Sequence, residues 1–266
     1  GNLLQVSAGV PNSALRAFDI AYEQSSGDGL IVYENDGSNG DAIFAYRTWN
    51  GTDYSAELTY DTGITTNAFQ WVKLTPKANS DNIMILVHNG ASELYAVEWN
   101  GTGMKTTTAG AVSIATTSGS EQHFDFAWEG SSGQGLFIFG VGTDIIYKTY
   151  DPVGGIGGAD NPITLGNGNG LDAARACGAP SSDDIGFIWQ DAGNDVNVAM
   201  WDGDAVLAGS PAEDGATEAN GGNNVPVDCV WVNDSTAIFG FVDLNALSVD
   251  YFTFENGGNT WSTSAL

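Results

Sequence analysis

The chain alternates short apolar runs with turns rich in glycine, asparagine and aspartate, a pattern that predicts an all-β protein. Residues 18–22 alternate between apolar and polar side chains, as expected of a strand with one buried face. Residues 30–33 form a continuous apolar run and predict a fully buried strand. A third strand over 42–46 leads into the turn Trp49-Asn50-Gly51-Thr52, which we expect to be a type I′ hairpin that starts a fourth strand. Because no segment shows a convincing 3.6-residue period, we expect almost no helix.

This group of four predicted strands recurs along the chain. Residues 19–30 align with residues 125–136 without a gap, and both segments contain the same Ser-Ser-Gly turn. Weaker copies place five residues in equivalent positions, at spacings of 53, 53, 50 and 51 residues: Leu30, Ile83, Leu136, Gly186 and Ala237. The sequence therefore predicts five repeats of about 50 residues.

A four-stranded antiparallel unit that repeats every ~40–50 residues is typical of a β-propeller blade. We therefore expect residues 1–266 to form a single domain, an all-β, five-bladed β-propeller with four antiparallel strands in each blade. Residues 3–7 resemble the end of a fourth strand, and residues 261–266 resemble its start. We expect the two termini to close the last blade together, because closure removes an exposed sheet edge.

The charge of the chain excludes one class of partner. Its 7 lysines and arginines face 33 aspartates and glutamates, for a formal net charge of -26. Such a charge repels phosphate backbones, so we expect no nucleic-acid partner. No apolar run reaches ~18 residues, so we expect no membrane span. No signal peptide is visible, but a mature secreted protein would have lost it, and we expect an extracellular or periplasmic location.

One polar position recurs in the predicted first strands, which are innermost in a propeller. The functional interpretation is a ring that binds a cation or a sugar, and the structural interpretation, which we favour, is pairing with neighbouring backbone groups. The three aspartates at this position could in principle serve as the acid and base of a glycosidase. They are symmetry-related copies, however, whereas an acid and a base need different environments. The five residues are Asp19, Gln70, Asp125, Arg175 and Asp228, and the three carboxylates are Asp19, Asp125 and Asp228.

Aromatic residues recur where the third strand meets its turn, at Trp49, Trp99 and Trp201. We expect them to pack between blades first and to form repeated sugar-stacking sites second. The loops at residues 35–41 and 191–195 are rich in oxygen ligands, but ordinary Asx turns explain them better than calcium sites do. The two histidines are too far apart in the sequence to indicate a metal site, so we expect no cofactor.

The two cysteines lie in the first strands of the fourth and fifth repeats. Cys177 shares the face of Arg175, whereas Cys229 lies on the face opposite Asp228. Adjacent blades meet through opposite faces, so we expect the two sulfurs to be close, with a Cα separation of ~4.4–6.8 Å that suits a disulfide. The alternative is a pair of buried free thiols.

Two short motifs resemble those of known propeller families. Asn256-Gly257-Gly258-Asn259-Thr260-Trp261 resembles the Asp-box of sialidase-type propellers, although Asn256 replaces its aspartate. The Trp-Asn-Gly-Thr turns resemble repeats of tachylectin-type, lectin-like five-bladed propellers. Both resemblances imply a structural role for these residues. The arabinanase-type glycosidases, whose carboxylates lie on inner strands, offer a third comparison.

These observations favour a non-enzymatic, extracytoplasmic propeller that binds glycans or a partner at a cell surface. The first alternative is a glycoside hydrolase that uses the inner-strand carboxylates. The second is a structural module of a larger surface protein. Fold alone does not choose among them, because one propeller architecture serves many functions.

Overall fold

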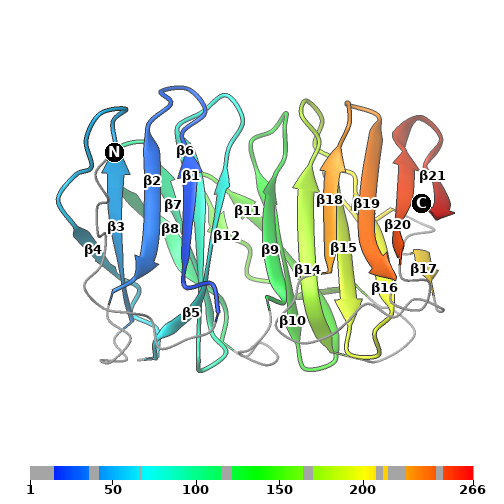
Figure 1. Cartoon of the computed structure of the whole chain (residues 1–266), viewed down its shortest axis with the longest axis horizontal. Helices are drawn as coiled ribbons and strands as arrows, with labels where there is room; N and C mark the ends of the chain where they lie inside the picture. Colours follow the sequence, from blue (N-terminus) through cyan, green and yellow to red (C-terminus); the bar gives the residue numbers. More distant parts are fainter. Residues whose placement is uncertain are drawn as a thin grey trace. The chain divides into compact units, whose positions relative to one another are not determined.

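The computed structural model describes most of the chain, in residues 15–35, 42–65, 67–114, 122–163, 170–207, 212–214, 226–243 and 248–265. In these ranges the strands form five antiparallel sheets, which we number in chain order (Figure 1). One 3₁₀ helix of three residues, η1 (Asn256–Gly258), is the only helix in the described ranges. None of their helical segments has the length and apolarity that crossing a membrane requires.

Each sheet is built from strands that follow one another in the chain. Sheet 1 comprises β1 (Phe18–Tyr22), β2 (Gly29–Glu34), β3 (Ile43–Trp49) and β4 (Leu58–Asp61). Sheet 2 comprises β5 (Phe69–Pro76), β6 (Asn82–Asn89), β7 (Leu94–Asn100) and β8 (Met104–Ser113).

The remaining three sheets follow the same order of pairing, except that sheet 3 has five strands instead of the predicted four, because two short segments pair with its third strand. Sheet 3 comprises β9 (Phe124–Trp128), β10 (Gly135–Val141), β11 (Asp144–Asp151), β12 (Gly155–Ile156) and β13 (Asn161–Ile163). Sheet 4 comprises β14 (Leu171–Gly178), β15 (Ile185–Asp191), β16 (Val196–Trp201) and β17 (Ala212–Asp214). Sheet 5 comprises β18 (Val227–Trp231), β19 (Thr236–Asp243), β20 (Ser248–Glu255) and β21 (Thr260–Ala265).

The predicted order of strands is confirmed, but the predicted turn type is wrong. The third strand of sheets 1, 2 and 4 ends in a turn in which only the glycine has a positive φ, as at Gly51 with φ 87°. A type I′ turn needs two such residues. Instead, the Asn50 side chain accepts hydrogen bonds from the N–H groups of Thr52 and Asp53, at 3.0 and 2.8 Å. These loops are therefore Asx turns, in which the side chain substitutes for a backbone acceptor.

The sheets are of two kinds that alternate along the chain. Sheets 1, 3 and 5, which we call A-type, begin with a strand of five residues. Sheets 2 and 4, which we call B-type, begin with a strand of eight residues that contains a β-bulge. The gapless match of residues 19–30 to 125–136 aligns sheet 1 with sheet 3, which are both A-type sheets. The structural repeat is therefore a pair of sheets, one of each type.

The chain divides into two compact units, residues 1–115 and 116–266. In the first unit, sheet 1 packs against sheet 2 through a cluster that includes Leu30, Phe44, Ile85 and Val97. In the second unit, one apolar cluster joins sheets 3 and 4 and another joins sheets 4 and 5. The buried strands that the apolar runs predict form these cores: β2 and β15 are buried at every position.

Residues 3–7, which the sequence assigns to closure of the last blade, lie outside the described residues. Their partner in that prediction, residues 261–266, overlaps β21, which pairs with β20. Closure by the two termini therefore stays a prediction, as does a ring of five blades.

Candidate functional site

The recurrent polar position of the first strands differs from its predicted form in sheet 2. The strand registers align Asp19, Asp125, Arg175 and Asp228, because each lies three residues before the last residue of its strand that pairs with the second strand. The same register places Lys73, not Gln70, in sheet 2. Gln70 lies at the bulge of β5, where the extra residue shifts the count. At this position, an acidic residue in each A-type sheet thus alternates with a basic residue in each B-type sheet.

Two of the three aspartates connect neighbouring sheets. Asp19 accepts a hydrogen bond from the N–H of Ile20 through Oδ1 and one from Leu74 in sheet 2 through Oδ2, both at 2.9 Å. Asp125 repeats this arrangement with Phe126 at 2.9 Å and Ala176 in sheet 4 at 3.1 Å. These bonds match the structural interpretation, in which carboxylates satisfy buried backbone donors.

Asp228 differs from these two aspartates because its side chain is exposed. Its Oδ1 accepts the N–H of Cys229 at 2.9 Å, as in the other A-type sheets. Arg175 donates to the carbonyl of Ala174 and, at 3.2 Å, to Gln122 Oε1. Arg175 and Asp228 both line a cavity of about 320 Å³ beside β18. The second unit therefore brings these two predicted residues together.

Two of the three predicted tryptophans join sheets rather than face solvent. Trp99 of sheet 2 is buried and donates from Nε1 to Glu23 Oε1, which follows β1, at 2.7 Å. Trp201 of sheet 4 makes the same bond to Glu129, which follows β9, at 2.8 Å. Burial raises the pKa of Glu129 above its ordinary value. These bonds assign Trp99 and Trp201 to the packing between sheets.

Trp49, the third predicted tryptophan, remains half-buried and lines an aromatic pocket on sheet 1. Its ring lies 4.8 Å from that of Tyr54, measured between centroids. Tyr22 and Tyr54 are 57% and 42% exposed, so their rings are available to a ligand. The pocket has a volume of about 240 Å³ and is lined by Ile20, Tyr22, Gly29, Leu30, Ile31, Trp49 and Tyr54.

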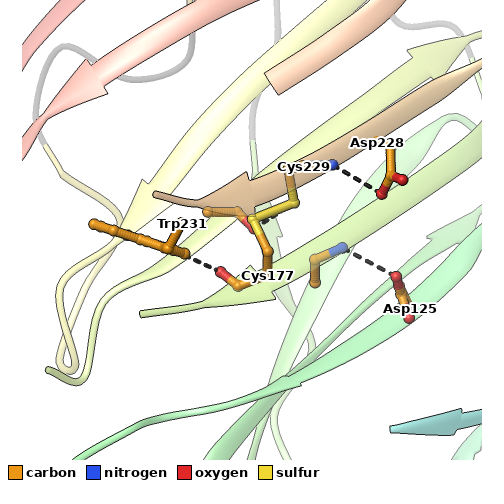
Figure 2. Close-up of a disulfide and its surroundings, with 7 residues drawn as sticks. Asp125, Cys177, Asp228, Cys229 and Trp231 are labelled. Carbon is orange, nitrogen blue, oxygen red and sulfur yellow. Dashed lines mark hydrogen bonds between the residues drawn. A yellow bond between two sulfur atoms is a disulfide. The ribbon is translucent and has the colours of Figure 1, made fainter. Parts of the chain in front are cut away.

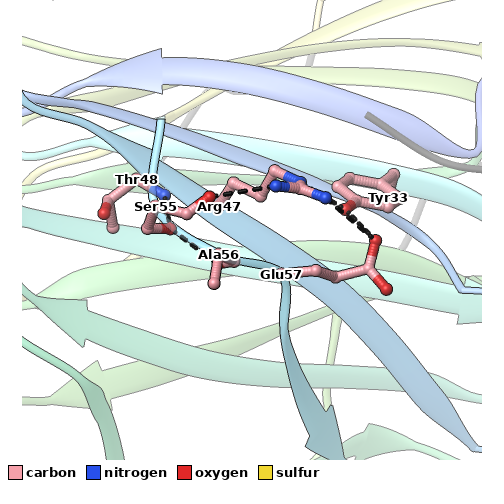
Figure 3. A network of polar contacts seen from close by, with 6 residues as sticks. All are labelled: Tyr33, Arg47, Thr48, Ser55, Ala56 and Glu57. Atoms are coloured by element: carbon pink, nitrogen blue, oxygen red, sulfur yellow. Dashed lines mark hydrogen bonds and ion pairs between the residues drawn. The ribbon is translucent and has the colours of Figure 1, made fainter. Parts of the chain in front are cut away.

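A charged network lies on the same face of sheet 1 as the aromatic pocket, two residues farther along β2 and β3 (Figure 3). Arg47 lies opposite Ile31, which lines the pocket, and two residues before Trp49. Its guanidinium donates to the hydroxyl of Tyr33 at 3.3 Å and lies 3.7 Å from Glu57. It also donates to the carbonyl of Ser55 at 3.0 Å. These contacts hold the guanidinium beside the aromatic pocket.

Tyr33 links the two charged groups of this network. Its hydroxyl donates to Glu57 Oε2 at 2.6 Å. Burial, together with the hydrogen bond to Glu57, raises the pKa of Tyr33 to about 12. The hydroxyl therefore stays protonated at neutral pH and continues to donate to the carboxylate.

Sheet 3 carries an internal copy of this charged pair. Lys148 has the register of Arg47, since it lies opposite Phe137 just as Arg47 lies opposite Ile31. Its ammonium contacts Asp160 at 2.9 Å. Neither pair is among the residues predicted from the sequence, although each cation lies two residues before a recurrent aromatic residue and the chain has only 7 lysines and arginines. The carboxylate partner could be identified only from the strand register.

The disulfide joins the first strands of sheets 4 and 5 (Figure 2). Cys177 and Cys229 have Cα atoms 5.9 Å apart, within the range that the sequence analysis gives for this pair. Trp231 donates from its indole to the carbonyl of Cys177 at 3.0 Å. Sheet 5 also contacts sheet 4 through the Asp-box-like segment, in which the amide of Asn256 donates to Asp184 at 2.6 Å.

The remaining candidate sites have structural explanations or are not described. Asp191 Oδ1 accepts the N–H groups of Gly193 and Asp195, so the loop at 191–195 is an Asx turn. Residues 36–41 of the other candidate loop lie outside the described residues. His88 and His123 are fully buried. Across the described ranges, no three His, Cys, Asp or Glu side chains cluster in a way that could hold a metal ion.

A scan against models of known protein families finds no match, and a search of curated proteins finds none either. Solved structures do match the fold. A fungal lectin from Aleuria aurantia, whose structure is described as a six-bladed β-propeller with a novel mode of fucose recognition, is 14% identical with a TM-score of 0.54. The match covers 95% of this chain and 78% of the lectin.

Two further matches show how far the likeness extends. A lectin from Burkholderia pseudomallei is 12% identical with a TM-score of 0.58, over 94% of this chain and 69% of that one. A eukaryotic initiation factor is 10% identical with a TM-score of 0.52, over 94% of this chain and 56% of that one. Because the second is not described as a lectin, the fold does not identify a ligand. The structure is similar to the β-propellers of lectins, and the chain has an all-β fold of that type.

Proposed function

We propose that this protein is a non-enzymatic, extracytoplasmic propeller that binds glycans through the aromatic pocket and the Arg47–Glu57 pair of sheet 1. A sugar ring has apolar C–H faces that can lie on aromatic rings, and hydroxyl groups that both donate and accept hydrogen bonds. Tyr22, Trp49 and Tyr54 supply the aromatic surface. Arg47 supplies donors and Glu57 an acceptor beside it.

The observation that carries this proposal is the presence of a charged pair on a face that could be purely apolar. In sheet 5, the register position of Arg47 holds Phe252, which is buried in the core shared with sheet 4. A cation and a carboxylate on a packing face are costly to desolvate, whereas an apolar pair packs without that cost. Arg47 and Glu57 are therefore better explained by a polar ligand than by packing.

Further observations support the location and the ligand class. A disulfide persists in oxidising compartments, so the Cys177–Cys229 bond favours an extracellular or periplasmic protein. The net charge of -26 disfavours a nucleic-acid partner. The fungal lectin among the similar structures is described as recognising fucose, which makes fucosylated glycans the first ligands to test.

The experiment is a glycan array probed with the purified protein, followed by calorimetric titration of the best ligand. Trp49→Ala and Arg47→Ala should each weaken binding at least tenfold, roughly the effect of losing 1.4 kcal/mol of binding free energy. Phe18→Ala is the matched control, because Phe18 is exposed on the same face but does not line the pocket. Absence of glycan binding, or equal affinities in all three variants, would overturn the proposal.

The glycoside hydrolase alternative keeps a direct test of its own. Its candidate carboxylates are Asp19, Asp125 and Asp228, of which the first two hold backbone N–H groups of the next sheet. Turnover of aryl glycosides that is lost in Asp125→Asn, with the fold retained, would establish the hydrolase instead. The five-bladed ring also stays a prediction.

A further inference from the structure

The turn beside the aromatic pocket of sheet 1 carries a carboxylate that the fold does not require. In sheets 1 to 4, the turn after the third strand is held by a side chain that accepts the backbone N–H three residues later. The pairs of acceptor and donor are Asn50 and Asp53, Asn100 and Gly103, Asp151 and Gly154, and Asp202 and Ala205, at 2.8, 3.0, 2.6 and 2.9 Å. Glycine and alanine donate this bond as aspartate does, so the turn needs no carboxylate at position 53.

Among these four turns, the carboxylate accompanies the tryptophan that is open to a ligand. Trp99 and Trp201 begin the turns of sheets 2 and 4, and both are buried against a glutamate of the preceding sheet. Trp49 begins the turn of sheet 1 and lines the pocket with Tyr54, which directly follows Asp53. The acid at position 53 is therefore better explained by the pocket than by the turn.

A second acid near the pocket shows the same correlation. The gapless alignment of sheets 1 and 3 places Gln134 where sheet 1 has Asp28, directly before the glycine at the start of the second strand. In sheet 3 the space over that glycine is filled, because a Cβ added to Gly135 would lie 2.3 Å from Cζ of Phe126. Sheet 1 has Ile20 in place of Phe126, and its pocket is open. The acid again accompanies the open pocket, and the neutral residue accompanies the filled one.

The two aspartates give the surroundings of the pocket a net negative charge. Residues 15–61 contain two cations, and each is ion-paired with a carboxylate of the same sheet. No ion pair in the described part of the chain neutralises Asp28 or Asp53. Each directly precedes a residue that lines the pocket, Gly29 or Tyr54. Neighbouring Cα atoms are about 3.8 Å apart, less than the Debye length of about 8 Å, so both charges act on a ligand in the pocket.

Arg47 does not make the pocket a site for anions. Its guanidinium is directed at Tyr33 and Glu57 (Figure 3), and it also donates to the carbonyl of Ser55 at 3.0 Å. Its charge is therefore balanced within sheet 1. A guanidinium has five N–H groups, so Arg47 keeps donors for a sugar hydroxyl. The carboxylate or sulfate of an acidic sugar would instead meet the unbalanced charge of the two aspartates.

We propose that the pocket selects glycans whose sugar carries a protonated amino group, that is, a hexosamine without an N-acetyl group. This inference rests on the proposed function, because it names the class of glycan that the same site takes. An ammonium group is attracted to the face of a Trp or Tyr ring within about 6 Å of its centroid. The centroids of Trp49 and Tyr54 are 4.8 Å apart, so one ammonium can lie within that distance of both. Asp28 and Asp53 supply the opposite charge, and a neutral N-acetylated sugar gains neither interaction.

The first test is calorimetric titration of the full chain with tetramers of glucosamine, N-acetylglucosamine and galacturonate. At about pH 6, where an amine is protonated, the glucosamine tetramer should bind about tenfold more tightly than the N-acetylglucosamine tetramer. This ratio should fall as salt is added, and the galacturonate tetramer should bind most weakly. Equal affinities for the first two tetramers, or tightest binding of galacturonate, would overturn this inference and leave the proposed function standing. If no glycan bound, the proposed function would fail and this inference with it.

The second test removes one carboxylate while keeping the turn. Asp53→Ala reproduces the alanine of the sheet 4 turn, so its thermal midpoint should stay unchanged, while the preference for the glucosamine over the N-acetylglucosamine tetramer should fall about fivefold. Asp204→Ala is the matched control, because it removes an exposed carboxylate from the turn of sheet 4, and it should leave that preference intact. Equal losses in the two variants would mean that the overall charge attracts the cation, and a lower midpoint in Asp53→Ala with both tetramers lost would assign Asp53 to the turn. Either result would overturn the inference.

Discussion

Replacing Trp99 by phenylalanine tests whether the indole–glutamate bonds hold the sheets together. The substitution removes the hydrogen bond from Nε1 to Glu23 Oε1, which is 2.7 Å long and joins two buried side chains. A hydrogen bond to a charged group contributes about 1.5–3 kcal/mol. The smaller ring adds about 1 kcal/mol through incomplete filling of its site. We therefore expect Trp99→Phe to lower the free energy of unfolding by about 3 kcal/mol in total.

Urea denaturation followed by far-ultraviolet circular dichroism measures this loss without relying on tryptophan fluorescence. Trp201→Phe should have nearly the same effect, because Trp201 makes the equivalent bond to Glu129 at 2.8 Å. Trp49→Phe is the control at the same strand position of sheet 1, where the ring is half-buried, and should cost less than about 1 kcal/mol. If all three variants lost the same free energy, ring size and not the bond to glutamate would explain the effect.

Three further predictions concern other contacts between sheets. Asp125→Ala leaves two backbone N–H groups without their acceptor and should cost about 2–4 kcal/mol in urea unfolding, whereas Asp228→Ala on the exposed face should stay within about 0.5 kcal/mol. Because the folded-state pKa of Glu129 is raised, this carboxyl group favours the folded state below its ordinary pKa of 4.5 and loses that contribution as the pH rises through its folded pKa. Glu129→Gln should thus gain stability relative to the parent above about pH 4.5, and urea midpoints that differ by the same amount from pH 4 to 7 would contradict this. Replacing Cys177 and Cys229 together by alanine should lower the free energy of unfolding by about 4 kcal/mol, from the loop entropy of their separation of 52 residues, and reduction of the parent chain should match it in the same urea assay.

The strand pattern could be predicted from sequence because each strand has a local signal. The apolar run at residues 30–33 and the Asn-Gly turn at 50–51 mark a buried strand and a hairpin without any knowledge of neighbours. The position of Lys73 could not be found in this way. The bulge in β5 adds a residue that counting along the chain does not reveal, so Gln70 was aligned in its place.

The candidate site shows a second limit on prediction from sequence. Trp49, Trp99 and Trp201 look equivalent in the sequence, yet two of them are buried against a glutamate of the preceding sheet and one lines a pocket. The difference depends on which sheet precedes each tryptophan in space. The contact between Arg47 and Glu57 depends on the register of β3 with β4, so neither residue stands out before the strands are paired.

The disulfide has a consequence for how the second unit comes apart. In an array of repeats, an inner repeat gains stability from two interfaces and a terminal repeat from one, so opening starts at the end. Within its unit, sheet 5 packs on sheet 4 alone, and the Cys177–Cys229 bond crosses that single interface. When the terminal sheet frays, the covalent link therefore keeps it attached to sheet 4, so its strands return to the same neighbour. After reduction, the amide hydrogens of β18 to β21 should be the first of the unit to exchange with solvent.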